Sequence, residues 1–161
     1  MENYLMLNGK RIDLTAEQIE TLEGKKEKGP FERAYFDQDY YYLNDDGRVF
    51  VDRDNWTEAD GARFLAANYC TDKELMAQRA LHVILNQQLW RYSMQHGGRD
   101  TNGFGAGAKF GLVKIGEEIE WTVIPFATPL GTAWFRSQTV ATKAIEEIVK
   151  PFMEKHTEFR W

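Results

Sequence analysis

The alternation of apolar and polar positions, interrupted by turn residues, predicts β-hairpins along much of the chain. The apolar run 4–7 is followed by Asn8-Gly9 and then by a second short stretch with apolar positions. Asn-Gly favours a two-residue hairpin turn because both residues tolerate positive φ. Tyr40–Leu43 and Arg48–Val51 flank Asn44-Asp45-Asp46-Gly47, which predicts a second hairpin.

A third hairpin is predicted beyond a glycine-rich region. Residues 97–116 hold seven of the 13 glycines of the chain. We interpret 97–107 as a connection, because glycine favours loops. The strands Ala108–Ile115 and Glu118–Phe126 are expected to follow, joined by a turn at Gly116-Glu117.

Capping signals followed by apolar residues at helical spacing predict helices. Thr15 with Gln18, and Thr71 with Glu74, have the spacing of a capping box, in which each side chain bonds the backbone of the other residue. The first pair is expected to open a short helix. The second is expected to open a long helix from about Asp72 to Met94.

The last helix is predicted to begin after an N-cap at Ser137 and to reach about His156. Pro151 lies inside it and should interrupt it near Glu147, because proline has no N–H to bond the carbonyl four residues earlier. Between the second hairpin and the long helix, residues 63–69 fit either a third strand or an irregular run.

Two parts of the chain resemble each other. Residues 76–81 align without gaps on 140–145, and each of these helices follows a hairpin, so we favour an internal repeat over a chance match. The predicted fold class is α+β, with antiparallel strands backed by helices. We expect a single domain, 1–161, in which a hairpin–helix unit precedes two pseudo-repeated hairpin–strand–helix units. Its predicted parts are 1–30, 31–96, the glycine-rich connection 97–107, and 108–161.

Charge narrows the range of partners. Of 161 residues, 20 are Lys or Arg and 25 are Asp or Glu, which gives a net charge of −5. The acidity is local, because residues 31–60 carry nine acids and three arginines and have a net charge of −6. This segment would repel phosphates, which disfavours DNA or RNA as its direct partner.

The chain has one cysteine, Cys70, and no apolar run as long as a membrane span. Its first residues lack the basic segment and the long apolar stretch of a signal peptide. We therefore expect a cytoplasmic protein with no internal disulfide and no membrane partner.

Catalytic and metal sites have weak support in the sequence. No two of the histidines His82, His96 and His156 have the i, i+3 or i, i+4 spacing of a helix-borne metal site. The acid pairs Asp37/Asp39 and Asp52/Asp54 have the oxygen ligands that Mg²⁺ prefers, but solvated loop acids are the favoured interpretation. We expect neither enzymatic activity nor a cofactor.

Four segments carry a resemblance to known proteins: 8–19, 40–47, 68–74 and 144–153. They resemble small uncharacterised accessory proteins of phages and prophages in Gram-positive bacteria. The similarity touches most of the chain except the glycine-rich middle. Such proteins often block host defences by binding, so the resemblance implies counter-defence in the host bacterial cytoplasm, without identifying a target.

Aromatic residues beside the acids predict where binding occurs. Protein–protein hot spots favour Trp, Tyr and Arg, and Trp56 lies in an acidic loop with few apolar neighbours in the sequence. The leading hypothesis is an anti-CRISPR-like inhibitor whose acidic, aromatic surface occupies a basic channel of a host defence protein or nucleoprotein. The predicted contact residues are Asp37, Asp39, Tyr40, Tyr42, Asp52, Asp54 and Trp56.

The alternative is sequestration of a small nucleotide immune signal in a pocket covered by the glycine-rich loop. Glycine exposes backbone N–H groups that bind phosphate, and nearby aromatic and basic side chains would hold the base and the phosphates. The candidate ligand residues are Arg99, Asn102, Lys109, Trp134 and Arg136. A nucleotide- or nucleic-acid-processing enzyme is a third interpretation, with the least support.

Overall fold

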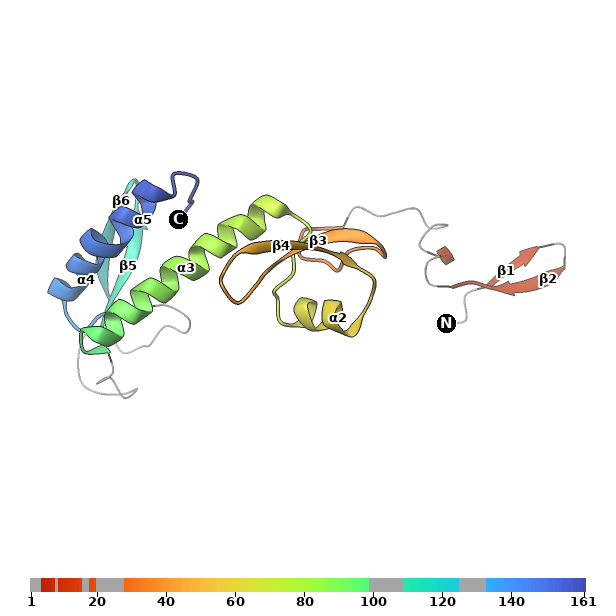
Figure 1. Ribbon diagram of the computed structural model, residues 1–161, viewed down its shortest axis with the longest axis horizontal. Coiled ribbons are helices and arrows are strands. Elements are labelled where there is room, and N and C mark those ends of the chain that lie inside the picture. The colour runs from red at the N-terminus through yellow and green to blue at the C-terminus, as the bar shows by residue number, and fades with distance from the viewer. Residues whose placement is uncertain (1–3, 8, 16–17, 20–27, 99–108, 125–132) are drawn as a thin grey trace. The chain divides into compact units, whose positions relative to one another are not determined.

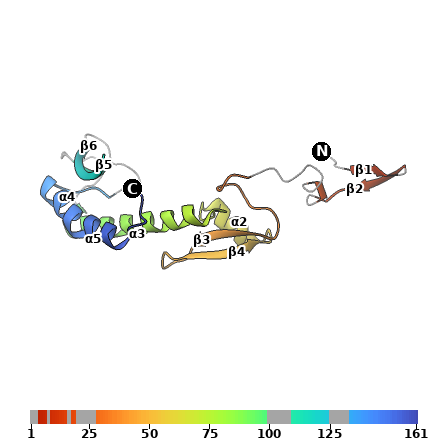
Figure 2. The same cartoon turned by 90° about the horizontal axis from the view of Figure 1, so that it is seen from above.

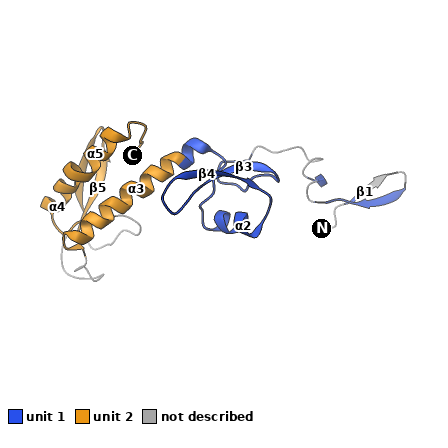
Figure 3. Cartoon of the chain, in the orientation of Figure 1, with its two compact units in different colours: residues 1–76 blue, residues 77–161 orange. Residues whose placement is uncertain are grey.

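The computed structural model describes residues 4–7, 9–15, 18–19, 28–98, 109–124 and 133–161. The chain is α+β and consists of antiparallel hairpins and helices (Figure 1), as the sequence predicts. It divides into two compact units, unit 1 at 1–76 and unit 2 at 77–161 (Figure 3). The division falls inside the long helix α3, Lys73–Gln95.

All three hairpins lie where their turn residues predict them. β1 (Tyr4–Leu7) pairs with β2 (Lys10–Asp13), β3 (Gln38–Leu43) with β4 (Val49–Asp54), and β5 (Lys109–Ile115) with β6 (Glu118–Ile124). Gly9, Gly47 and Gly116 have φ values of 76°, 79° and 61° in the three turns. Glycine suits these positions because it has no Cβ to oppose positive φ.

The capping prediction at the N-terminal end is confirmed. The Gln18 side chain accepts from the Thr15 N–H (3.0 Å), and the Thr15 hydroxyl accepts from the Gln18 N–H (3.3 Å). At α3 the predicted cap is wrong. The Asp72 carboxylate accepts from the N–H groups of Glu74 (2.8 Å) and Leu75 (3.0 Å), so Asp72 is the capping residue in place of Thr71.

Unit 1 contains a helix that the sequence analysis does not predict. Helix α2, Glu58–Leu65, begins at the N-cap Thr57 and covers part of the stretch that was expected to be a strand or an irregular run. The rings of Tyr69 and Phe64 meet edge-on with centroids 5.5 Å apart. Together with Ala34, Tyr40 and Tyr42 they form the apolar core of the unit.

In unit 2 the β5–β6 hairpin lies across one side of α3 and of the C-terminal helix (Figures 1 and 2). That helix begins after the predicted N-cap Ser137 as α4, Gln138–Ala144, passes through a π-helical turn, η2, Ile145–Val149, and ends as α5, Lys150–Lys155. The irregular turn includes Glu147, so the interruption predicted from Pro151 is confirmed. The Lys150 N–H bonds the carbonyl of Ile145, five residues earlier.

The core of unit 2 combines side chains from all of its described elements. Its buried members are Leu81, Leu85, Leu89, Tyr92, Phe135, Ala141, Ala144, Val149, Phe152 and Phe159. Phe110 and Trp121 of the hairpin pack against this group, with their ring centroids 5.6 Å apart. The hairpin is therefore fixed to the helices by its apolar face.

Both units share one local arrangement. In unit 1 the first strand of the β3–β4 hairpin forms an antiparallel bridge from Tyr41 to Cys70, and in unit 2 the first strand of the β5–β6 hairpin bridges Phe110 to Phe135. Cys70 lies two residues before Asp72, the N-cap of α3, and Phe135 lies two residues before Ser137, the N-cap of α4. The wider pseudo-repeat, with the same strand order in both halves, stays a prediction.

Candidate functional site

Unit 1 contains two buried aspartates, Asp54 and Asp60, which are 0% and 3% exposed. Burying a carboxylate costs free energy unless hydrogen bonds and cations replace the water that it loses. Among the described residues, every buried side-chain nitrogen and oxygen has a hydrogen-bond partner. The partners of these two aspartates therefore show how the unit is held together.

Asp54, the last residue of β4, is bonded by three separate parts of unit 1. Arg33 donates from Nε to Oδ2 (3.0 Å) and from Nη2 to Oδ1 (3.1 Å), a two-bond geometry that suits a guanidinium and a carboxylate. The Tyr69 hydroxyl donates to Oδ2 (2.7 Å), and the Trp56 backbone N–H donates to Oδ1 (2.9 Å). Asp54 thus ties the end of the hairpin to residues far away in the sequence.

Asp60 has the same role at the first turn of α2. Its Oδ2 accepts from the N–H groups of Asn55 (3.1 Å) and Thr57 (3.0 Å) and from the Thr57 hydroxyl (2.7 Å). Its Oδ1 accepts from the Tyr40 hydroxyl (2.8 Å). Arg63 donates from Nη1 to the same hydroxyl oxygen, so Tyr40 is both a donor and an acceptor.

Tyr40 and Tyr69 connect the two networks. Their rings stack with centroids 4.1 Å apart and planes at 12°, and each hydroxyl donates to one of the buried aspartates. Burial raises the pKa of both hydroxyls, that of Tyr40 to about 12. Both tyrosines are therefore protonated donors at neutral pH.

Burial alone would raise the pKa of Asp54 and Asp60, yet both pKa values lie below the usual carboxyl value. For Asp54, hydrogen bonds from Arg33 and Tyr69 outweigh the desolvation. For Asp60, hydrogen bonds led by that of Thr57 do so. Hydrogen bonding to the charged form favours it, so both aspartates are ionised at neutral pH and their charges are compensated within the fold.

The two aspartates hold the turn 55–57 by its three successive N–H groups. Trp56, at the centre of this turn, has a φ of 56°, a left-handed conformation that costs a non-glycine residue about 1–2 kcal/mol. Trp56 is 42% exposed, and its indole meets the ring of Phe36, also an exposed residue, edge-on with centroids 5.6 Å apart. The buried network therefore fixes an aromatic pair at the surface.

Charged residues adjoin this pair. Asp37 follows Phe36, and its N–H donates to the carbonyl of Asp54 (2.9 Å). Arg53 forms ion pairs with Asp37 (3.2 Å) and Asp39 (3.5 Å), and all three side chains are more than half exposed. Two carboxylates share one guanidinium, so this group has a net negative charge. We call Phe36, Asp37, Asp39, Arg53 and Trp56 the hairpin-end cluster.

The predicted contact residues do not form one surface. The strand register pairs Tyr40 with Asp52 and Asp39 with Arg53, and side chains of neighbouring pairs point to opposite faces of a hairpin. Tyr40 and Asp54 are 0% exposed, so the expectation that they face a partner is corrected. Both belong to the interior of unit 1, because their polar atoms are needed by buried groups.

The other predicted contact residues are accessible to different degrees. Tyr42 and Asp52 both contact Arg63, whose guanidinium lies 3.9 Å from the ring centroid of Tyr42 and 2.8 Å from Oδ2 of Asp52; Asp52 is exposed but lies on the opposite face of the hairpin from Asp39. Asp37, Asp39 and Trp56 are exposed and lie together in the hairpin-end cluster. The structure thus brings together three of the seven residues at one site.

Sequence analysis missed Phe36, Arg33 and the buried role of Asp60. Phe36 and Arg33 lie about 20 residues from their partners Trp56 and Asp54, and no local pattern links residues at that separation. Asp60 has a local signal, because Thr57 and Asp60 have capping-box spacing, and the structure shows both reciprocal bonds. That spacing is a local signal for the start of α2.

The residues predicted for a nucleotide pocket are only partly within the described chain. Arg99 and Asn102 lie outside the described residues, as does the loop expected to cover the pocket. Lys109, 8% exposed, places Nζ 5.2 Å from the ring centroid of Trp134. Arg136 packs against Gly97, where an added Cβ would lie 2.9 Å from the guanidinium. Lys109 and Trp134 are therefore adjacent, and the lysine occupies one face of the indole.

The described part of the chain shows neither a metal-binding group nor a membrane-crossing helix. It contains no group of three His, Cys, Asp or Glu side chains placed to hold a metal ion. None of its helices combines the length and the apolar sequence that crossing a membrane requires. Comparisons with protein family models, curated proteins and solved structures find no match to the chain.

Proposed function

We propose that the chain binds a protein partner through the hairpin-end cluster. The resemblance to phage accessory proteins favours a bacterial defence protein or nucleoprotein as that partner, and inhibition by occupancy as the outcome. The observation that carries the proposal is the exposed Phe36–Trp56 pair on a backbone that two buried aspartates hold in place.

The aromatic pair has the properties of an interface anchor. Trp is among the residues most enriched at hot spots, where it fills a pocket of the partner and excludes water. Binding normally costs entropy when the interface becomes ordered. The backbone of Trp56 is already fixed by the hydrogen bond from its N–H to Asp54, so little further ordering of this turn is needed on binding.

The charges of the cluster favour a basic partner. Within the described residues, Asp37 and Asp39 share one cation, Arg53, so the rim of the aromatic pair is negative. A negative rim attracts a positive surface during diffusional encounter and repels phosphates. This is the arrangement expected for a protein that occupies a basic channel.

The proposal is tested with two variants and two matched controls. Trp56→Ala removes the anchor, and the double variant Asp37→Asn with Asp39→Asn removes the negative rim. Trp90→Ala removes a tryptophan that is 59% exposed in unit 2, and Asp45→Asn removes an exposed acid in the β3–β4 turn. Each protein is used to capture partners from a lysate of a Gram-positive bacterium, and binding kinetics are then measured at several salt concentrations.

We expect a partner that binds the wild type and both controls equally. Trp56→Ala should speed dissociation by about tenfold or more, because loss of a buried anchor acts on residence time. The double Asp variant should slow association and flatten its salt dependence, since the steering field is reduced. Failure to capture any protein, or a partner that binds both test variants as well as the wild type, would overturn the proposal.

A further inference from the structure

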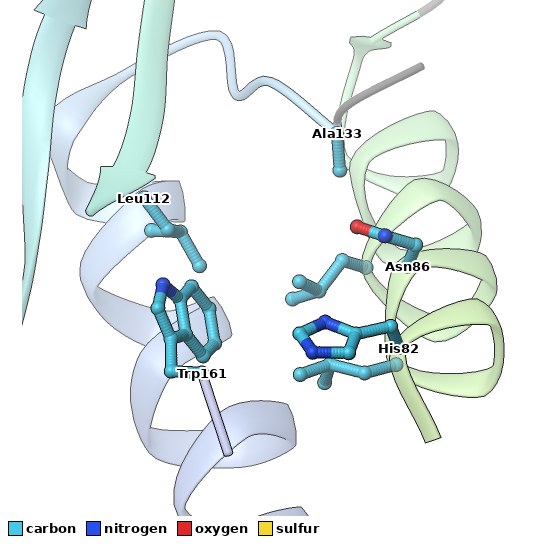
Figure 4. A pocket seen from close by; sticks show the side chains of 7 residues that line it. His82, Asn86, Leu112, Ala133 and Trp161 are labelled. Atoms are coloured by element: carbon cyan, nitrogen blue, oxygen red, sulfur yellow. The ribbon is translucent and has the colours of Figure 1, made fainter. Parts of the chain in front are cut away.

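Unit 2 contains a cavity of about 250 Å³ beside α3 (Figure 4). We propose that it binds a small, uncharged, planar nitrogen heterocycle. None of its lining residues belongs to the hairpin-end cluster, so the proposal goes beyond partner binding. The lining residues are His82, Leu85, Asn86, Leu89, Leu112, Ala133 and Trp161.

The walls of the cavity suit a flat ligand. The indole of Trp161 stands opposite His82 and Asn86, with Leu112 above it (Figure 4). Leu85 contributes buried apolar surface beside them. Aromatic rings favour offset stacking on one another, so a planar ring that enters this space gains a stacking partner on the Trp161 side.

The polar groups of the cavity suit a heterocycle. His82 and Asn86 are four residues apart on α3, which places both on one helix face. No hydrogen bond joins either side chain to another described residue, so both are available to a ligand. The Asn86 amide carries a donor next to an acceptor, which is the pattern that pairs with the donor–acceptor edge of a nucleobase.

The size and charge of the cavity limit the ligand further. A cavity of about 150 Å³ holds a benzene ring, whereas pockets for drug-sized ligands begin at about 300 Å³. A volume of about 250 Å³ therefore fits a ligand of one or two rings. The lining side chains include no Asp, Glu, Lys or Arg, so none of them would pair with a charged group of a ligand.

Gln78 holds the wall that Trp161 forms. Its Nε2 donates to the carbonyl of Glu158 (2.7 Å), and its Oε1 accepts from the N–H of Arg160 (2.9 Å). Between these two bonds, Phe159 is buried with its ring 4.8 Å from that of His82. Trp161 directly follows this clamped segment, so Gln78 is a positioning residue for the proposed site.

Adenine, cytosine and uracil are the probes, and cyclohexanol, a ring that is not planar, is the control. Each is titrated into the full-length ¹⁵N-labelled protein while the indole N–H signal of Trp161 and the side-chain amide signals of Asn86 are followed by NMR. Trp161→Phe assigns the indole signal. We expect at least one base to shift both signals saturably, with a Kd of about 1 mM or lower, and cyclohexanol to shift neither.

Three variants test the assignment of roles. Asn86→Ala should weaken the binding of that base by about tenfold, the effect of losing one or two hydrogen bonds. The variant should fold, because Asn86 is exposed and alanine favours helix. Gln78→Ala should also weaken binding and broaden the Trp161 signal. Gln87→Ala, at the next exposed position of the same helix, should bind as the wild type does.

Two results would overturn the proposal: no saturable shift with any of the three bases, or equal affinity in Asn86→Ala and the wild type. Neither result bears on the hairpin-end cluster, because Asn86→Ala leaves all five residues of that cluster unchanged. Partner capture by Asn86→Ala is therefore expected to equal that of the wild type, which separates failure of this inference from failure of the proposed function.

Discussion

The hydroxyl of Tyr69 joins parts of unit 1 that are distant in the sequence. It accepts from the N–H of Ala34 (2.9 Å) and donates to Asp54 (2.7 Å). Asp54 also bonds Arg33, and Arg63 bonds Asp52 in the same unit. Part of the acidity of residues 31–60 is therefore required by the fold, so the earlier expectation that its carboxylates are solvated loop acids is too broad.

Asp54 gives the stability of unit 1 a dependence on pH. Its pKa is lower in the folded chain than the ordinary value of 3.8, so the charged form stabilises the fold above that value. We expect the free energy of unfolding to be level near neutral pH and to fall as the pH drops from about 5 through the lowered pKa. Denaturant unfolding at a series of pH values measures this.

The matched variant is Asp54→Asn. It should lower the free energy of unfolding at pH 7 by about 2 kcal/mol, which is less than for a fully buried pair because Arg33 reaches solvent. The variant should also reduce the slope of the free energy of unfolding against pH below about pH 5. The part of the slope that Asp60 contributes should remain, because its pKa is lowered as well. An unchanged slope in the variant would contradict the assigned role of Asp54.

The sequence does not show which of Asp52 and Asp54 is buried, and the reason is physical. Both residues lie in Asp52-Arg53-Asp54, and the strand period places them on the same face. Asp52 is exposed whereas Asp54 is not, because Arg33 and Tyr69 meet only the second of the two. Such long-range contacts are not encoded by local spacing, so exposure of single acids could not be predicted.

At the scale of elements, the hairpins and the C-terminal helix were predictable because their determinants are local. Gly47 and Gly116 supply the positive φ of their turns. Pro151 removes one helical N–H, and the chain responds with a π turn that includes Glu147. Helix α2 was missed although the Thr57–Asp60 capping spacing is local, because the segment is short and Gly61 interrupts its helical pattern.

Two variants test whether Asp72 or its neighbour Thr71 is the N-cap of α3. Asp72→Ala should lower the free energy of unfolding by about 1 kcal/mol, because the N–H groups of Glu74 and Leu75 lose their acceptor. Thr71→Ala should cost less, since the hydrogen bond that the Thr71 hydroxyl makes within the described residues, to the Pro30 carbonyl, is long (3.5 Å). Thermal unfolding of both variants measures the difference. A larger cost for Thr71→Ala would restore the cap predicted from sequence.

At the scale of the whole molecule, the division into two units is not visible in the sequence. It falls within α3, where a continuous helical pattern gives no sign of a boundary. The units also differ in what stabilises them. Unit 1 relies on buried hydrogen bonds around Asp54 and Asp60, whereas unit 2 has a broad apolar core.

This difference predicts unequal local stability. Among the described residues, unit 1 has five buried apolar side chains and unit 2 has twelve. Regions with fewer buried apolar contacts open at lower free energy. Native-state hydrogen exchange followed by NMR should therefore show amides of β3, β4 and α2 exchanging about tenfold faster or more than those in the middle of α3 and in α4.

Tyr69→Phe is the matched variant for this prediction. It removes the hydroxyl that bonds both Ala34 and Asp54 and keeps the ring that stacks on Tyr40. A buried carboxylate and a buried N–H each lose a partner, which costs about 1–3 kcal/mol per group, so exchange in β3, β4 and α2 should accelerate. Equal protection of both units in the wild type, or no acceleration in Tyr69→Phe, would show that buried hydrogen bonds do not set the stability of unit 1.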